Sequence, residues 1–308
     1  MTTSNGTSRV SVSEFEQIFE SVKNWGRWGA DDERGTLNHI DPAIVSAASG
    51  LVTEGRSISL GRALDTVAGP DNPRPALHYM TELTGPDSSG ASGNKDFIGV
   101  DFHAKVSHLD ALPHIAYQGA LYGGRSSVAT VGTSGSRFAG VDVLADGVVT
   151  RGVLLDAAPG ESLTSSRALA PDDLAEIARR QSVEVRRGDA VLVRGGSPTQ
   201  RREWSEPAPA PRRVGLHPLG LSWLLDREIA LLGSDGNSEA LPGIVDGVGA
   251  PVHVLAIVAA GMCLLDSLDL DELARACSAS GRFEFLLVVA PLIIRGGTGS
   301  PVNPIAVI

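Results

Sequence analysis

Apolar residues recur at three- and four-residue intervals over residues 11–25, with charged and polar residues between them. This spacing places the apolar side chains on one face of a helix. The stretch opens with a serine and early glutamates, which is typical of a capped helix N-terminus. Residues 41–52 repeat the pattern, with Asp41 as the expected cap and Pro42 in the first turn. We therefore predict an N-terminal helical segment over about 1–52.

Short runs rich in valine and leucine and bounded by glycine occur later in the chain, as is typical of buried strands. Helical patterns lie between them, so the sequence predicts a mixed α/β fold. The expected strands cover 146–158, 188–196, 282–294 and 303–308, the expected helices cover 170–183 and the first part of 215–235, and residues 253–277 are expected to form a strand or turn followed by a helix.

Residues 65–95 are rich in proline, glycine and serine and predict a long loop. Such a loop is unusual inside a compact domain unless it covers or forms a site. The apolar run at 97–100 then predicts a buried strand that leads into another loop. Nothing in the sequence marks a break between domains, so we predict a single domain over 1–308.

Composition limits the classes of partner. The formal net charge of −10 and the pI near 5.2 argue against binding to nucleic acid or to anionic membranes, which would repel the chain. The expected partner is a small-molecule substrate. Two cysteines, Cys263 and Cys277, are too few for a disulfide framework and are expected to be buried thiols. With neither a signal-peptide pattern nor an apolar stretch of about 18 residues, a cytoplasmic location is expected.

Candidate chemistry is concentrated in residues 103–114, which hold three of the seven histidines and one aspartate. In extended chain, His108 and Asp110 lie on the same face, and a proline precedes His114. Imidazole and carboxylate groups that converge on one point are the ligands of zinc and manganese. The alternative is a chance grouping of surface or core histidines.

The sequence of this cluster resembles a family motif. "SHLDALPH" is similar to His-x-Gly-Thr-His-x-Asp-x-Pro-x-His, the signature of the cyclase-like metal-dependent hydrolases, which include bacterial kynurenine formamidase and isatin hydrolase. Residues 24–42, 215–235 and 285–308 also resemble segments of the actinobacterial branch of that family. The resemblance implies a swivelling β/β/α domain with a barrel-like mixed sheet flanked by helices, and a homodimer or higher homo-oligomer.

The resemblance also implies roles for individual residues. His108 and Asp110 match the motif's second histidine and its aspartate, which bind the metal in the family. His114 matches the last histidine, a second-metal ligand or the acid/base. The motif's first histidine falls on Ala104, and a one-residue bulge would let His103 take that position instead.

A second part of the site is expected further along the chain. The family uses a later histidine and a glutamate about a dozen residues on, and His253 with Asp266 stand in roughly that relation. Asp266 could instead cap the following helix. His217 is expected to be a surface or capping residue rather than a pocket acid/base. Asp235 and Glu239 are expected in a solvated turn rather than in a binding site.

These residues predict an enzyme. With a divalent cation, Zn or Mn, at His103, His108, Asp110, His114, His253 and Asp266, a bound water would ionise near neutral pH and attack a polarised carbonyl. His108, Asp110 and His114 are the predicted catalytic residues, with His114 carrying the proton. The expected reaction is hydrolysis of an amide, lactam or ester bond of a small, aromatic or polyketide-type molecule, or a cyclisation in the reverse sense.

Two alternatives remain open at this stage. The same histidines could serve as acid/base groups of a metal-independent cyclase or dehydratase of secondary metabolism. A non-catalytic binding protein is the other alternative, and the aspartate beside two histidines argues against it, because a buried carboxylate needs a partner.

Overall fold

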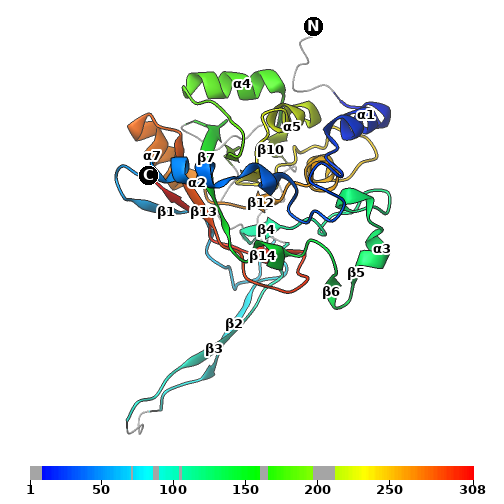
Figure 1. Ribbon diagram of the computed structural model, residues 1–308. Helices are drawn as coiled ribbons and strands as arrows, with labels where there is room; N and C mark the ends of the chain where they lie inside the picture. Colours follow the sequence, from blue (N-terminus) through cyan, green and yellow to red (C-terminus); the bar gives the residue numbers. More distant parts are fainter. Residues whose placement is uncertain (1–8, 71, 86–89, 104–105, 160–165, 197–211) are drawn as a thin grey trace.

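The computed structural model describes residues 9–70, 72–85, 90–103, 106–159, 166–196 and 212–308 of the chain. Ala104, the position of the motif's first histidine, lies outside these residues. Within them, a curled half-barrel sheet of nine strands is flanked by helices (Figure 1), which confirms the predicted α/β class and fold. In spatial order its strands are β1 (Ser57–Ser59), β15 (Ile305–Val307), β13 (Glu284–Val289), β7 (Val148–Asp156), β9 (Ala190–Arg194), β11 (Leu231–Ser234), β12 (Leu264–Asp266), β4 (His108–Asp110) and β14 (Gly299–Pro301).

The sheet is parallel in the middle and antiparallel on both sides. Strands β7, β9, β11 and β12 run parallel, whereas β13, β15 and β1 on one side and β4 and β14 on the other pair antiparallel. The parallel strands are buried on both faces, which explains their continuous Val/Leu runs. Three two-stranded sheets complete the strands of the described residues: β8 (Arg167–Leu169) with β10 (Val214–Leu216), β5 (Val131–Gly132) with β6 (Gly135–Ser136), and β2 (Leu77–Glu82) with β3 (Lys95–Gly99).

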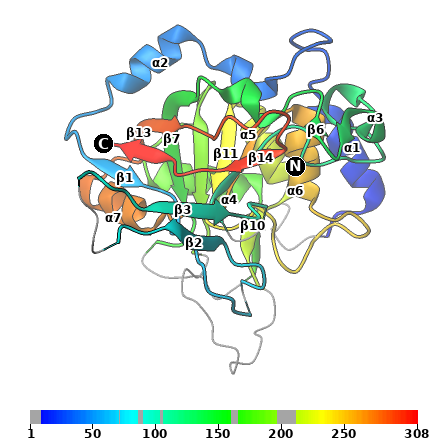
Figure 2. The same ribbon diagram turned by 90° about the horizontal axis from the view of Figure 1, so that it is seen from below.

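The first two helices begin at the capping residues that the sequence predicts. In the first helix, the Ser11 hydroxyl accepts from the Glu14 amide and the Glu14 carboxylate accepts from the Ser11 amide. The Asp41 carboxylate accepts from the Ile44 amide at the start of α2 (Pro42–Ser49), which lies along one side of the sheet (Figure 2). The α-helices are α1 (Val12–Val22), α2 (Pro42–Ser49), α3 (Ser127–Thr130), α4 (Pro171–Arg180), α5 (Pro218–Leu225), α6 (Pro251–His253) and α7 (Asp271–Ser280), with 3₁₀ turns η1 (Gly35–His39), η2 (Tyr122–Gly124) and η3 (Val141–Leu144).

Residues 253–260, expected as a strand or turn, instead form a buried helix. After α6, the chain continues as a π-helix, η4 (Val254–Ala260), in which every residue is buried. A helix that is apolar on all sides belongs in a core, and its sequence gives no amphipathic signal by which to tell it from a buried strand. It ends at Gly261, whose φ of 71° suits glycine.

The segment after residue 65 also differs from the prediction. Part of the expected loop, together with the run at 97–100, forms the β2–β3 hairpin, which stands away from the body of the molecule (Figure 1). Phe97 and Ile98 are 44% and 56% exposed, so the expectation of a buried strand at 97–100 was wrong. An apolar run normally indicates burial, and here the fold leaves it in solvent.

No helix in the described part of the chain combines the length and the hydrophobicity needed to cross a bilayer.

Candidate metal centre

Strand β4 presents two of the candidate ligands to one cavity. Alternate residues of a strand face the same side, so His108 and Asp110 both line the cavity while Leu109 between them is fully buried in the core. Strand β12 pairs antiparallel with β4 and places Asp266 opposite His108. Asp266 is the last residue of β12 and lies in the same cavity, so it does not cap α7, which begins at Asp271.

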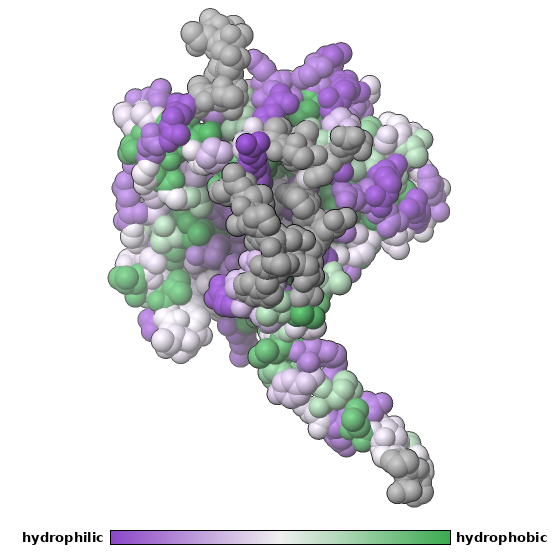
Figure 3. All heavy atoms as spheres, turned by 180° about the vertical axis from the view of Figure 1, so that it is seen from behind, coloured by the Kyte–Doolittle hydropathy of each residue, from purple (hydrophilic) through white to green (hydrophobic). Residues whose placement is uncertain are grey.

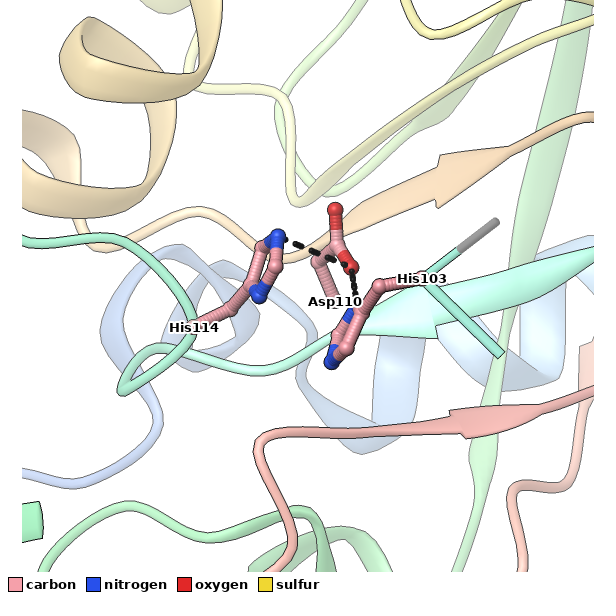
Figure 4. Close-up of side chains that lie close together, drawn as sticks. All are labelled: His103, Asp110 and His114. Atoms are coloured by element: carbon pink, nitrogen blue, oxygen red, sulfur yellow. Dashed lines mark hydrogen bonds and ion pairs between the residues drawn. The ribbon is translucent and has the colours of Figure 1, made fainter. Parts of the chain in front are cut away.

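The Asp110 carboxylate is the centre of the cluster. Its Oδ1 lies 2.9 Å from His103 Nδ1, 3.4 Å from His108 Nε2 and 3.8 Å from His114 Nε2. Its Oδ2 lies 3.6 Å from His253 Nε2. Figure 4 shows the His103 and His114 rings both turned toward this carboxylate. Four imidazoles from different parts of the chain therefore converge on one buried acid.

His103 reaches the cluster although the motif places its first histidine one residue later. The His103 Nε2 atom lies 2.9 Å from Thr298 Oγ1, beside β14. Its ring stacks on that of His114, with centroids 3.8 Å apart and planes at 9°. The two side chains are 23% and 22% exposed, more than the rest of the cluster, so they form its open side.

His253 is held from behind by Glu239. A single oxygen, Glu239 Oε1, accepts from the His253 amide at 3.0 Å and lies 2.9 Å from His253 Nδ1. The other ring nitrogen, Nε2, is thereby aimed at the carboxylates, 3.3 Å from Asp266 Oδ2. Glu239 and Asp235 are only 7% and 6% exposed, so the expectation of a solvated turn was wrong for both residues. A carboxylate behind the imidazole fixes the tautomer of metal-binding histidines in many proteins.

The N-terminal segment supports the helix that follows His253. Carbonyl groups at the end of a helix lack partners within it. Here Trp25 Nε1 donates to the Val258 carbonyl at 2.7 Å, the Asn24 amide to the Ala259 carbonyl at 3.0 Å, and the Thr36 amide to the Gly261 carbonyl at 2.9 Å. The segment that contains Trp25 therefore stabilises η4, which directly follows His253 in the chain.

Burial and charge act against each other at these side chains. Burial alone would lower the pKa of His253, but its bonds to Asp266 and Glu239 outweigh burial and raise it to about 10. Burial would also lower the pKa of His108, but the contact with Asp110 outweighs burial and raises it. His114 has less help from Asp110, and burial lowers its pKa to about 4.

The two aspartates differ. Burial would raise the pKa of Asp110, but hydrogen bonds from His103 and His108 hold it well below its usual range. Burial prevails at Asp266, whose pKa is raised. The lowered pKa of Asp110 favours its ionised form in the interior, and a buried carboxylate requires cationic partners.

The residues line a cavity of about 220 Å³, which all six predicted metal ligands reach. Ile115, Asn237, Ala250 and Ser267 complete its wall. A larger cavity of about 710 Å³ lies beside α4 and α7, but its lining has no histidine. The smaller cavity therefore holds the candidate metal centre.

The donor atoms fit a divalent cation. Two sets, His103 with Asp110 and His114, and His108 with Asp110 and Asp266, each hold three ligand atoms within 4.8 Å of one another. Asp110 Oδ2 and Asp266 Oδ1 are buried and have no hydrogen-bond partner among the described residues. Orphaned buried carboxylate oxygens are costly, and a cation would satisfy both. Nitrogen and carboxylate donors suit Zn or Mn.

The remaining candidates lie elsewhere. His217 caps α5, where its Nδ1 accepts from the Leu219 amide, in agreement with the capping role expected of it. His39 packs against Trp28, and His78 lies on β2. Glu239, which the sequence analysis assigned to a turn, contacts the cluster through His253; its fourteen-residue separation from His253 matches no local motif.

Comparison with known proteins identifies the family. The profile of the family described as "Putative cyclase" matches residues 77–239, more than half of the chain. The chain belongs to this cyclase family. A solved structure, "a novel cyclase", is 29% identical over 94% of this chain and 99% of its own, with a TM-score of 0.83.

Other cyclase-family neighbours are more distant. Isatin hydrolase A from Labrenzia aggregata, bound to benzyl benzoate, is 23% identical over 86% of this chain and 96% of its own, with a TM-score of 0.57. Isatin hydrolase A from Ralstonia solanacearum is 21% identical over 86% of this chain and 95% of its own, with a TM-score of 0.55. At these identities the likeness shows the shared fold. No curated protein matches the chain.

Proposed function

We propose that this protein is a divalent-metal-dependent hydrolase that cleaves an amide, lactam or ester bond of a small molecule. The observation that carries the proposal is the convergence of four imidazoles and two aspartates on one cavity, where two buried carboxylate oxygens have no hydrogen-bond partner among the described residues. The isatin hydrolase name of two structural neighbours agrees with this reaction type. We propose a small substrate, because the cavity is about 220 Å³, and an aromatic one by analogy with the isatin hydrolases.

The proposed metal ligands are His103, His108, Asp110, His253 and Asp266, and His114 is left to carry a proton. A divalent cation in this cavity lowers the pKa of bound water and polarises a carbonyl oxygen. The chain itself supplies orientation and a proton route. Glu239 holds His253 with Nε2 toward the cavity, and Asp110 holds His103 and His108 in place.

His114 is the proposed proton carrier. Its imidazole lies on the open side of the cluster and stacks on His103, so its position is fixed while one face of the site stays accessible. In hydrolysis, an oxygen atom from water bonds to the carbonyl carbon and the bond to nitrogen or oxygen breaks. His114 takes a proton from that water and delivers it to the leaving atom.

The experiment is hydrolysis in water enriched in oxygen-18. Untagged protein is incubated with formamides, lactams and aryl esters, before and after removal of metal by a chelator. The proposal predicts a product carboxylate that carries one labelled oxygen, and loss and recovery of turnover with metal removal and addition. Turnover of the same substrates by the metal-free protein at an unchanged rate would contradict it and favour acid/base chemistry by the histidines alone.

A further inference from the structure

The larger cavity, of about 710 Å³, lies at the carboxyl ends of two neighbouring parallel strands. Asp156 ends β7, Arg194 ends β9, and both line the cavity. None of its described lining residues belongs to the β2–β3 hairpin, which stands clear of the body of the molecule in Figure 3. Crevices at this end of parallel strands are common ligand sites in α/β folds, and the volume suits a small molecule.

Helix α7 forms one wall of the larger cavity. Ala274, Arg275 and Ser278 lie on one face of this helix, and all three line the cavity. The remaining apolar lining comes from Pro159, Ala279 and Phe283. The small side chains leave space beside the helix, and the apolar groups suit a hydrocarbon or aromatic group on a ligand.

The acidic residues of the larger cavity are already paired. Arg194 is 9% exposed, and it donates to the Asp156 carboxylate at 3.0 Å and to the Asp271 carboxylate at 2.9 Å. Both carboxylates belong to residues that line the cavity. A cation would have to compete with this buried guanidinium, so the cavity is not suited to binding one.

Two further arginines at the cavity have no carboxylate partner. Arg180 donates to the Asp156 carbonyl oxygen at 2.9 Å, and within the described part of the chain neither Arg180 nor Arg275 pairs with an acid. Three arginines and two aspartates leave the lining with one net positive charge, in a chain whose net charge is −10. A cleft of this sign attracts an anion, and a guanidinium group binds a carboxylate through two parallel N–H donors.

A buried amide at the cavity has a donor without a partner. Gln181 is 6% exposed, and its Oε1 accepts from the Asp156 amide at 3.2 Å, which orients the side-chain amide. Its Nε2 is buried and has no hydrogen-bond partner among the described residues. Because an unsatisfied buried donor is costly, an acceptor atom on a ligand would be stabilised here. A carboxylate oxygen is such an acceptor.

We propose that the larger cavity binds a small carboxylate with an apolar body, at a second ligand site separate from the candidate metal centre. The carboxylate lies between Arg180 and Arg275, one of its oxygens accepts from Gln181 Nε2, and the apolar body packs against Phe283. A phosphate group carries more charge than the single positive charge of the lining balances, and it leaves the apolar wall unused. The two cavities share no lining residue, and the inference does not depend on the proposed function.

The test is a calorimetric titration with benzoate. Wild-type protein should bind one benzoate per chain with a Kd on the order of 1 mM, and neutral benzamide at least about 10-fold more weakly. The double variant Arg180→Gln with Arg275→Gln should raise the Kd for benzoate by about 10-fold or more, and both side chains are exposed, so the variant should fold. Arg179→Gln is the matched control, because Arg179 is the next residue of α4, pairs with Glu176 and does not line the cavity.

Thiol labelling locates the bound benzoate. Both native cysteines are buried, so a cysteine introduced as Ser278→Cys, at an exposed residue of the cavity wall, is the reactive one. Saturating benzoate should slow the labelling of this cysteine several-fold. Ser46→Cys, at an exposed serine of α2 outside the cavity, is the control and should be labelled at the same rate with and without benzoate.

Four results would overturn the proposal. They are the absence of benzoate binding up to about 20 mM, equal affinity for benzamide, unchanged affinity in the double arginine variant, and labelling of Ser278→Cys that benzoate does not slow. Displacement of benzoate by an equal concentration of inorganic phosphate would overturn the carboxylate class. Benzoate binding that the arginine variant keeps but that is lost when a chelator removes metal would place benzoate at the metal centre and would also overturn the second site.

Discussion

Strands β4 and β2 reverse the usual distribution of side chains. In β4 all three residues are buried, including a histidine and an aspartate, whereas in β2 all six are exposed, including a leucine, a tyrosine and a methionine. Buried polar groups and exposed apolar groups are both informative because folding alone disfavours them. The polar groups buried in β4 suit a cation, whereas β2 leaves apolar groups in solvent. Function is concentrated where the rule is broken.

The largest effect is expected when the buried charge of β4 is removed. Asp110→Asn keeps the size of the side chain but removes the negative charge that four imidazoles surround. Turnover on a hydrolysed substrate should fall by a factor of about 1,000 or more, since a metal-dependent centre loses its cation. Rates measured with and without added metal check this. Unchanged kcat/KM in the variant would remove Asp110 from the mechanism.

The same substitution in the two regions should affect stability very differently. Leu109→Ala in β4 opens a cavity in the core and should lower the free energy of unfolding by about 3 kcal/mol. Leu77→Ala in β2 removes a side chain that is 59% exposed and should lower the free energy of unfolding by less than about 0.5 kcal/mol. Urea denaturation of both variants at low concentration gives the comparison, and equal losses would contradict it.

A smaller effect is expected from the group behind His253. Glu239→Gln keeps the shape but weakens the hydrogen bond that aims His253 Nε2 at the carboxylates. Metal affinity should fall by roughly 10- to 100-fold. Competition with a calibrated chelator measures this without a substrate. Glu176→Gln, the same change at an exposed glutamate of α4 outside the cavity, is the control and should bind metal as the wild type does.

A buried histidine without carboxylate bonds sharpens the contrast within the core. His39 packs against Trp28, and burial lowers its pKa to about 4, whereas Asp266 and Glu239 raise that of His253 to about 10. Unfolded His39 has the higher pKa and binds its proton first. The neutral His39 therefore does not reduce the free energy of unfolding above pH 6.5. That free energy decreases as the pH falls from 6.5 toward 4, because the unfolded state takes up the proton first.

At pH 4.5 this loss should amount to about 2 kcal/mol. A His39→Gln variant should lose less stability between pH 7 and pH 4.5 than the wild type does. Thermal unfolding of the two proteins at both pH values checks the difference. Identical losses would show that His39 does not contribute to acid sensitivity.

The sequence predicted what depends on local pattern. The caps at Ser11 and Asp41, the buried strands β7 and β9, and the shared face of His108 and Asp110 follow from neighbours in the chain. The motif resemblance extended this to His253 and Asp266, which the fold brings to the same cavity.

What the sequence could not predict depends on tertiary contacts. The apolar run at 97–100 alone does not tell a buried strand from an exposed hairpin, because the difference depends on which other parts of the fold pack against the strand. The π-helix η4 is apolar on every side and lacks a period that separates it from a strand. Glu239 became recognisable only when the fold placed its oxygen against His253.

The central claim is that the histidine and aspartate cluster around Asp110 holds a divalent cation. It is tested most directly by elemental analysis of untagged protein purified without chelator, before and after reconstitution, together with Asp110→Asn and His108→Ala. His78→Ala, at a histidine of β2 outside the cavity, serves as the control. The account predicts at least one equivalent of Zn or Mn per chain in the wild type and the control, and its loss in both site variants. A folded wild-type chain without metal after reconstitution, or full metal content in Asp110→Asn, would contradict it.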